Sequence, residues 1–223
     1  MKLKLEVLIL TMPSRKEFLR QLVRNLADQC IRHKNFGYRI RMCDPSYTLG
    51  ENRDMLKRSS IGEYIAFIDD DDLVPDHYAS EILPLLDRDY VGFQVQCYID
   101  GTPLLNKTYH SLRYENWYED ENGYYRDISH INPMRRELSL LEPMEGGIGE
   151  DVRWADRMRG KVKTERFIPK VMYNYFFRTH KNIAAPCPKC DSKSTVLVET
   201  GCFCNSCGHF FNEHPAQKSC LWV

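Results

Sequence analysis

Four consecutive aspartates directly follow a short apolar run, and this junction constrains the fold more than any other part of the 223-residue chain. Residues 64–68 read Tyr-Ile-Ala-Phe-Ile, which is typical of a buried strand, and residues 69–72 are all Asp. Adjacent carboxylates at the end of a buried strand repel one another unless a cation or hydrogen-bond donors offset their charge. Their hard oxygens suit Mg²⁺ or Mn²⁺. The alternative interpretation is a solvated acidic turn ahead of a helix that begins near Pro75.

Strand-like and helix-like segments alternate along the chain around this junction. We expect strands over residues 5–10, 38–42, 64–68, 91–99 and 167–177. Helices are expected from Ser14, which forms a capping-box pattern with Glu17, from Gly50, over residues 76–86, and from Glu150. This order predicts an α/β fold with a mostly parallel sheet flanked by helices. Ligands of such sheets bind beyond the carboxyl ends of the strands, where Asp44 and the four aspartates are expected.

Composition excludes several classes of protein. Lys plus Arg and Asp plus Glu both number 31, so the formal net charge gives no argument for a nucleic-acid or membrane partner. A hydrophobic fraction of 43% indicates a folded chain rather than a disordered one. The sequence has no long apolar stretch and no cleavage signal. We therefore expect no membrane span and no secretory signal, and a soluble, cytoplasmic protein.

Two stretches leave their interpretation open. Residues 100–125 are polar and rich in Tyr, and they fit either a hairpin or mobile loop that borders a substrate cleft or an aromatic cluster packed under a long loop. Residues 153–170 hold seven basic residues against two acidic ones. That excess of positive charge fits either a contact with the phosphates of a polymeric acceptor or the solvated face of a helix.

Six of the nine cysteines fall within the last 37 residues, which suggests a metal site rather than disulfides. Two Cys-X-X-Cys pairs lie 13 residues apart, and their four thiolates suit tetrahedral Zn²⁺: Cys187, Cys190, Cys204 and Cys207. The pattern resembles a zinc ribbon. We expect residues 185–223 to form this small module and residues 1–184 to form the α/β domain, with structural Zn²⁺ supplying most of the module's folding free energy.

Several motifs in order resemble one known family. They are the segments at residues 11–15, 50–53 and 64–72, the element at residues 149–154, Asp44, and a late Arg-Thr-His at residues 178–180. Over residues 3–184 the chain resembles glycosyltransferases of the inverting family 2 type, which have the GT-A (Rossmann-like) fold. The resemblance implies transfer of a sugar from a nucleotide-sugar donor, most simply a UDP-sugar, to an acceptor hydroxyl.

The resemblance also implies roles for single residues. It places the donor against a set of residues from the first half of the chain: Thr11, Pro13, Arg15, Asp44, Arg53, Asp69 and Asp70. Asp71 would hold Mn²⁺ or Mg²⁺, and His180 resembles a late histidine that approaches the metal or diphosphate. The family's Asp-X-Asp motif has Asp at its middle position here, so its register among residues 69–72 is open.

On the acceptor side, Asp151 corresponds to the family's general base and Glu150 would orient it. His130 and Trp154 are expected on the same side. One displacement with a single carboxylate base inverts the anomeric carbon.

Other interpretations concern the acceptor and the class of protein. A compact transferase with a ribbon also resembles virus-encoded enzymes that glycosylate hydroxymethylated bases in DNA, which would place it in the host cytoplasm; surface polysaccharide synthesis is the alternative. A nucleotidyltransferase would need a glycine-rich basic loop after the first strand, and residues 11–15 are not such a loop. A non-catalytic nucleic-acid-binding protein would leave Asp44, the acidic cluster and Asp151 without a purpose.

Overall fold

The computed structural model describes residues 3–178, 189–190, 195–198, 201–204 and 210–211, and side chains only as far as residue 190. The chain divides into two compact units, Met1–Phe176 and Phe177–Val223, which are described separately. The division that we expected between residues 184 and 185 falls in a stretch outside the described residues.

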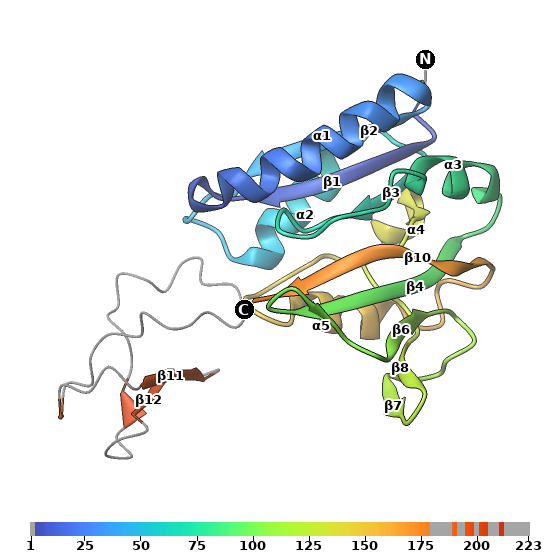
Figure 1. Cartoon of the computed structure of the whole chain (residues 1–223). Coiled ribbons are helices and arrows are strands. Elements are labelled where there is room, and N and C mark those ends of the chain that lie inside the picture. Colours follow the sequence, from blue (N-terminus) through green and yellow to red (C-terminus); the bar gives the residue numbers. More distant parts are fainter. Residues whose placement is uncertain (1–2, 179–188, 191–194, 199–200, 205–209, 212–223) are drawn as a thin grey trace. The chain divides into compact units, whose positions relative to one another are not determined.

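The first unit contains the α/β fold (Figure 1). Its first half runs β1 (Leu5–Thr11), the 3₁₀ turn η1 (Pro13–Arg15), α1 (Lys16–Arg32), β2 (Phe36–Met42), α2 (Leu49–Ser59), β3 (Tyr64–Phe67), α3 (Tyr78–Ile82) and η2 (Leu83–Leu85). Its second half runs β4 (Tyr90–Ile99), β5 (Thr102–Pro103), β6 (Lys107–His110), β7 (Tyr118–Asp120), β8 (Gly123–Arg126), β9 (Met134–Arg135), α4 (Arg136–Ser139), α5 (Glu150–Met158) and β10 (Glu165–Phe177).

One large sheet has the strand order β2-β1-β3-β9-β4-β6-β8-β7, and β5 and β10 also pair with β4. β1 runs parallel to both β2 and β3, and these three strands form its parallel core. Beyond β3 the short strand β9 is antiparallel to both β3 and β4 and joins the two halves of the sheet. The prediction of an α/β sheet flanked by helices is confirmed, and the antiparallel pairs beyond β3 are an addition to it.

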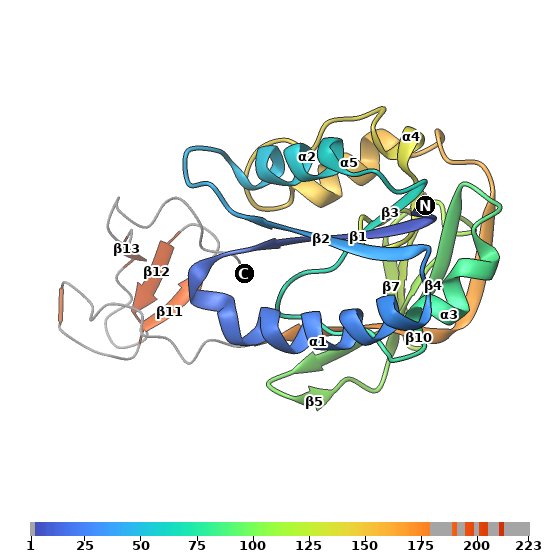
Figure 2. The same ribbon diagram turned by 90° about the horizontal axis from the view of Figure 1, so that it is seen from above.

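Alternating side chains of β1 supply both layers of the core. Leu5, Val7 and Ile9 pack with buried residues of α1 and α3. Leu8, on the opposite face, packs with Leu56 of α2 and with a second cluster that includes residues of α5. Figure 2 shows the same arrangement, with α1 on one side of β1 and β2 and with α2 and α5 on the other. The sheet is therefore covered on both faces, as a parallel sheet requires.

Two of the expected helices differ from the prediction. Ser14 caps no helix: it lies within η1, and α1 begins after it with no side-chain cap. The capping box is instead at α2, where the Thr48 side chain accepts from the Glu51 backbone and Glu51 accepts from the Thr48 N–H. The helix expected over residues 76–86 is shorter, because α3 gives way to η2 at Leu83, just before Pro84.

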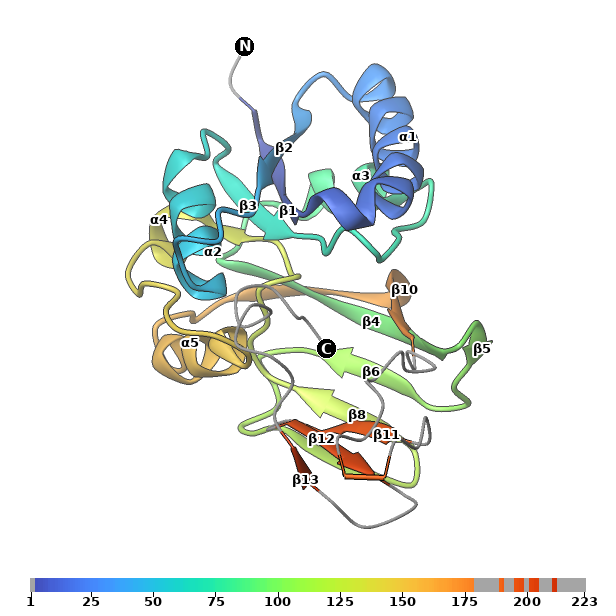
Figure 3. The same cartoon turned by 90° about the vertical axis from the view of Figure 1, so that its left-hand side faces the viewer.

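The aromatic stretch at residues 100–125 lies on the half of the sheet beyond β4, where Figure 3 shows β6 and β8, and β7 pairs with β8. The Tyr125 ring stacks on Tyr109 at 5.4 Å and on Tyr118 at 4.6 Å, and Tyr114 meets it edge-on at 4.9 Å. The stretch therefore contains a hairpin of β7 and β8 whose rings pack on one another, and a place beside a substrate stays a prediction.

The described part of the second unit is a three-stranded antiparallel sheet of β11 (Thr195–Val198), β12 (Gly201–Cys204) and β13 (Phe210–Phe211). Cys187 and Cys207 lie outside the described residues, and no side-chain position is described for Cys204 at the end of β12. Cys190 is exposed in a turn. The zinc ribbon therefore stays a prediction. Among the described residues, no helix is both long and apolar enough to cross a membrane.

Candidate active site

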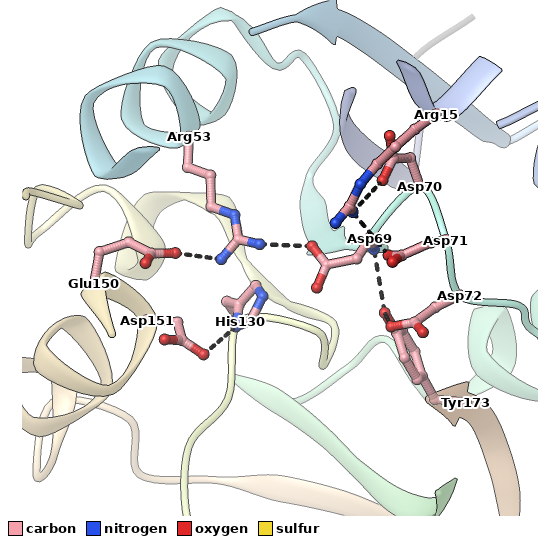
Figure 4. A network of polar contacts seen from close by, with 10 residues as sticks. All are labelled: Arg15, Arg53, Asp69, Asp70, Asp71, Asp72, His130, Glu150, Asp151 and Tyr173. Atoms are coloured by element: carbon pink, nitrogen blue, oxygen red, sulfur yellow. Dashed lines mark hydrogen bonds and ion pairs between the residues drawn. The ribbon is translucent and has the colours of Figure 1, made fainter. Parts of the chain in front are cut away.

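The four aspartates follow the carboxyl end of β3, beside the end of β1, and each has different partners (Figure 4). Asp70 is 2% exposed and accepts from the Thr11 hydroxyl at 2.6 Å and from Arg15 at 2.9 Å. Asp71 is half-buried and lies 3.1 Å from the same Arg15 guanidinium. Buried Asp70 therefore has the environment of a structural anchor, and Asp71 remains accessible to solvent.

Asp72 points away from Arg15 and is held by β10. Its carboxylate accepts from the Tyr173 hydroxyl at 2.8 Å and from the Phe176 backbone N–H at 2.8 Å. Burial and repulsion from Asp69 raise the pKa of Asp72 well above its ordinary value. The Tyr173 hydroxyl also accepts from the Asp69 backbone N–H at 3.1 Å, so this one phenol ties the first and last aspartates together. The two partly exposed carboxylates of the turn are therefore those of Asp69 and Asp71, which are two positions apart.

Arg53 joins this acidic turn to α5. Its guanidinium donates to Asp69 Oδ1 at 2.6 Å through Nη2, and through Nη1 to Glu150 Oε1. The side chain is 8% exposed and its charged carbon lies 5.9 Å from the centre of the Phe67 ring. Desolvation opposes the charge of Arg53, but Asp69 and Glu150 outweigh it and raise the pKa further above the ordinary arginine value. Arg53 is therefore a permanent cation between two acidic groups from distant parts of the sequence.

The close packing of the first turn of α2 allows Arg53 to reach Glu150 of α5. Gly50 N–H donates to the Gly146 carbonyl at 2.8 Å, and a Cβ at Gly50 would lie 2.5 Å from the backbone of Glu145. Asn52 ties the same turn to Asp44, since its amide nitrogen donates to the Asp44 carbonyl at 2.9 Å. The Gly-Glu-Asn-Arg segment therefore sets the spacing between α2 and the loop before α5.

Lys57 holds the C-terminal part of α2 against the same region of the chain. It is fully buried on α2, and its ammonium donates to the carbonyls of Ser139 at 3.0 Å and Glu142 at 2.6 Å. Asp54 lies 3.1 Å away as its ionic partner. Burial lowers the pKa of Lys57, and Asp54 opposes this. Gly50 and Lys57 together hold α2 against residues 139–146.

Glu150 and Asp151 open α5, directly after Gly149, which has a φ of 79°. Glu150 is 1% exposed, and burial raises its pKa to about 7 although Arg53 opposes the shift. The Asp151 side chain is 30% exposed and its Oδ2 lies 3.6 Å from His130 Nδ1. Two adjacent carboxylates thus have different environments: one is buried against a cation and the other reaches solvent beside a histidine.

The other residues expected here lie as follows. Pro13 opens η1, and Asp44 follows β2 at the same edge of the sheet, where its carboxylate accepts from the Ser46 N–H at 2.9 Å. Trp154, expected on the acceptor side, is 2% exposed and lies in the core, with the Lys57 ammonium 5.7 Å from its ring centre. His180 lies outside the described residues. Sequence reasoning missed Tyr173, which carries no local signal because its partner Asp72 is 101 positions away.

Fold and site together define a GT-A type α/β protein, with a carboxylate-rich, arginine-bridged site beyond the ends of its parallel strands. The chain belongs to glycosyl transferase family 2, whose family model matches residues 2–139. This match includes β1 to α4, and with them Arg53, the four aspartates and His130.

Solved structures agree on the fold. S. aureus TarS residues 1–349 align with a TM-score of 0.56 and 14% identity, covering 78% of this chain and 60% of that one. The same TarS region in complex with UDP-GlcNAc gives a TM-score of 0.58 and 16% identity, covering 79% and 59%. Its complex with UDP gives 0.57 and 14%, covering 78% and 61%. The chain thus spans less than two thirds of these structures. No curated protein matches it.

Proposed function

We propose that this chain is an inverting glycosyltransferase that moves a sugar from a UDP-sugar to an acceptor hydroxyl. The observation that carries the proposal is the Arg53 bridge, which brings the acidic turn after β3 and the first turn of α5 to one place. Membership of glycosyl transferase family 2 supports the reaction class. TarS, with the same fold, has been solved with UDP-GlcNAc and with UDP, which supports uridine in the donor.

Asp151 is the proposed general base. Its carboxylate is partly exposed, whereas Glu150 is buried against Arg53, so an acceptor hydroxyl can reach only the former. Taking the acceptor proton as the hydroxyl oxygen attacks the anomeric carbon gives one displacement and inversion. Glu150 then serves to fix Arg53, and through it Asp69, rather than to contact the acceptor.

The carboxylates of the acidic turn fit a divalent cation whose remaining ligands come from the nucleotide-sugar donor. Asp69 and Asp71 offer hard oxygens and are both partly exposed. Nowhere in the described part of the chain are three His, Cys, Asp or Glu side chains grouped to hold a metal ion. Mg²⁺ typically takes one or two carboxylates and completes its ligands with substrate phosphates and water. We therefore propose Asp71, with Asp69 beside it, as the residues that hold Mn²⁺ or Mg²⁺, which when bound would offset the charge of the leaving diphosphate.

The charges around the basic stretch favour a glycan over DNA as the acceptor. Arg166 lies 2.7 Å from Asp87, Lys170 lies 2.6 Å from Glu81, and Arg159 lies 2.5 Å from Asp127. Arg157 and Lys161 both pair with Glu142. Most of the positive charge of this stretch therefore already has an acidic partner within the fold, which leaves little to neutralise a phosphate backbone.

Calorimetry on the full chain tests the proposal. We expect UDP and at least one UDP-sugar to bind in the presence of Mn²⁺, and binding to weaken by about 10-fold or more for Asp71→Asn. Asp76→Asn, which changes an exposed carboxylate five positions further on, is the matched control and should bind as the unaltered chain does. If no uridine nucleotide binds with either metal, the proposal is wrong. Incubation with labelled UDP-sugars and either hydroxymethylpyrimidine DNA or glycan acceptors then distinguishes the two classes of acceptor.

A further inference from the structure

His130 is a buried histidine without hydrogen bonds on its ring. It is 8% exposed, and neither Nδ1 nor Nε2 has a hydrogen-bond partner among the groups that the structure describes. Buried polar side chains normally have partners, because an unpaired one loses its hydration without compensation. His110 follows that rule: it is 6% exposed, and its Nδ1 lies 2.7 Å from Asn132 Oδ1. A hydrophobic residue would serve the core better than His130 does, which points to a role beyond packing.

The ring of His130 is aimed at the proposed base. Its Nδ1 lies 3.6 Å from Asp151 Oδ2, slightly beyond hydrogen-bonding distance (Figure 4). The backbone on this side is fixed, because the His130 carbonyl accepts from the Phe67 N–H at 2.9 Å and the two rings pack with their centres 5.8 Å apart. The Asp151 side chain is partly exposed, so its rotation can shorten this distance. Catalytic hydrogen bonds are often long before substrate binds and shorten in the complex.

The charged groups around the ring decide what it can donate. Arg53, Asp69 and Asp151 all act on it, and burial together with the positive charge of Arg53 lowers the pKa of His130 to about 4. A neutral imidazole carries one N–H and one lone pair. With the lone pair on Nδ1, a negative carboxylate would face a negative lobe. The tautomer with its proton on Nδ1 turns this contact into a hydrogen bond.

We propose that His130 is a positioning residue that donates Nδ1–H to Asp151 Oδ2 and thereby holds the other carboxylate oxygen towards the acceptor hydroxyl. The inference rests on the proposed function, in which Asp151 is the base. It assigns His130 a contact with the base rather than with the acceptor.

Three substitutions at one position test the inference. In His130→Leu the donor is lost, and we expect kcat to fall about 10- to 100-fold with the KM for the donor unchanged. In His130→Asn the amide nitrogen falls near the Nδ1 position, so turnover should recover to within about 3-fold of the unaltered chain. In His130→Gln the amide falls near Nε2, and turnover should stay low. A His130→Asn variant as impaired as His130→Leu would overturn the inference, as would a His130→Leu variant with normal turnover.

Stability separates a positioning role from a packing role. His130→Leu should leave Tm nearly unchanged, because it removes the unpaired Nε2 and because the partly exposed Asp151 carboxylate can bond to water in place of Nδ1. The matched His110→Leu should lower Tm because it leaves the buried Asn132 Oδ1 without its partner. A large loss of Tm in His130→Leu would make His130 an ordinary core residue.

A measurement without turnover keeps this test apart from that of the reaction itself. Nitrogen-15 NMR of the histidine-labelled full chain should show His130 neutral and protonated on Nδ1 at pH 7, with the signal altered in Asp151→Asn. A proton on Nε2 overturns the inference whether or not sugar transfer is found. Conversely, if Asp151→Asn keeps its turnover while His130 shows the expected tautomer, the assignment of the base fails and the His130–Asp151 contact stands.

Discussion

Arg53 and Asp69 lie 16 positions apart in the sequence, and their side chains meet at 2.6 Å beyond the end of β3. The same guanidinium contacts Glu150, so this cation holds two carboxylates that would otherwise repel each other. The arrangement explains how an acidic site can be stable before any substrate or metal ion binds. It also makes the site depend on single residues in ways that can be measured.

At pH 8, above the pKa of about 7 that Glu150 has in the fold, Arg53→Met should destabilise the protein by about 3–5 kcal/mol, because it leaves the buried Glu150 carboxylate without its cation. Urea denaturation measures this free energy of unfolding. Arg20→Met, which removes an exposed arginine from its pair with Glu17, is the control and should change it by about 1 kcal/mol or less. Combining Arg53→Met with Glu150→Gln should recover part of the loss. No recovery would mean that the bridge is not the source of the effect.

Asp151→Asn should reduce kcat by about 100- to 10,000-fold and leave the Kd for the UDP-sugar nearly unchanged, because only the acceptor proton loses its destination. Asp156→Asn on the same helix changes an exposed carboxylate and should keep normal turnover. Steady-state rates of UDP release with a matched calorimetric Kd give both quantities. Near-native turnover in Asp151→Asn would falsify the assignment of the base.

Tyr173→Phe should cost about 1–3 kcal/mol of stability, because the hydroxyl bonds both Asp72 and the Asp69 backbone. Tyr78→Phe is a closely matched control: Tyr78 is equally buried, but its hydroxyl has no hydrogen-bond partner among the described groups. Its loss should be neutral or slightly stabilising. Thermal denaturation of the pair is sufficient, and equal losses in both variants would contradict the role given to Tyr173.

Gly50→Ala should impair the site although the residue contacts no substrate, because the new Cβ would lie 2.5 Å from the backbone of Glu145 and push α2 away from the loop before α5. We expect a loss of about 1–3 kcal/mol and a fall in kcat. Gly147→Ala, in the same loop but with open space around its Cβ, should behave normally in both assays. If the two variants are indistinguishable, the close approach at Gly50 does not matter.

Stability should depend on pH through Glu150. Burial raises its pKa to about 7 in the folded protein, against an ordinary value of 4.5, so between these pH values the folded state binds more protons than the unfolded state. The free energy of unfolding that Glu150 contributes is therefore full below pH 4.5 and is lost as pH rises through 7. Glu150→Gln removes this dependence. The stability of Glu150→Gln relative to the unaltered chain should accordingly rise from pH 4.5 to pH 7, and urea denaturation at several pH values would show a constant difference if the shift were absent.

The parallel core of the fold was predictable because its signals are local. An apolar run of strand length marks β1 and β3, and helical spacing marks α1, so the alternation of elements can be read directly. The helix start at Ser14 was wrong because a capping pattern is short and recurs by chance; the segment at Thr48 has the same pattern and does form the box. The sequence alone does not tell which of the two patterns forms a capping box in the folded chain.

The partners within the site were less predictable, because they depend on contacts across the chain. The four aspartates are chemically identical in the sequence, and only their partners on η1, α2 and β10 distinguish them. Trp154 was expected at the acceptor and lies in the core, since helical spacing places it on the inner face of α5 with Ala155 and Met158. A pattern of residue types therefore predicts the location of a site more reliably than the role of each residue in it.

The acidic turn has a consequence for how substitutions in it should be interpreted. Asp69 contacts Arg53 of α2, and Asp70 accepts a hydrogen bond from Thr11 of β1. Asp71 is partly exposed beside Arg15, and Asp72 accepts a hydrogen bond from the backbone of β10. Inserting a fifth aspartate would leave the run made of aspartate alone and add only one charge. It would nevertheless shift each carboxylate into its neighbour's environment. The four residues are identical in type but lie in four different environments, so the length of the run matters as much as its chemistry.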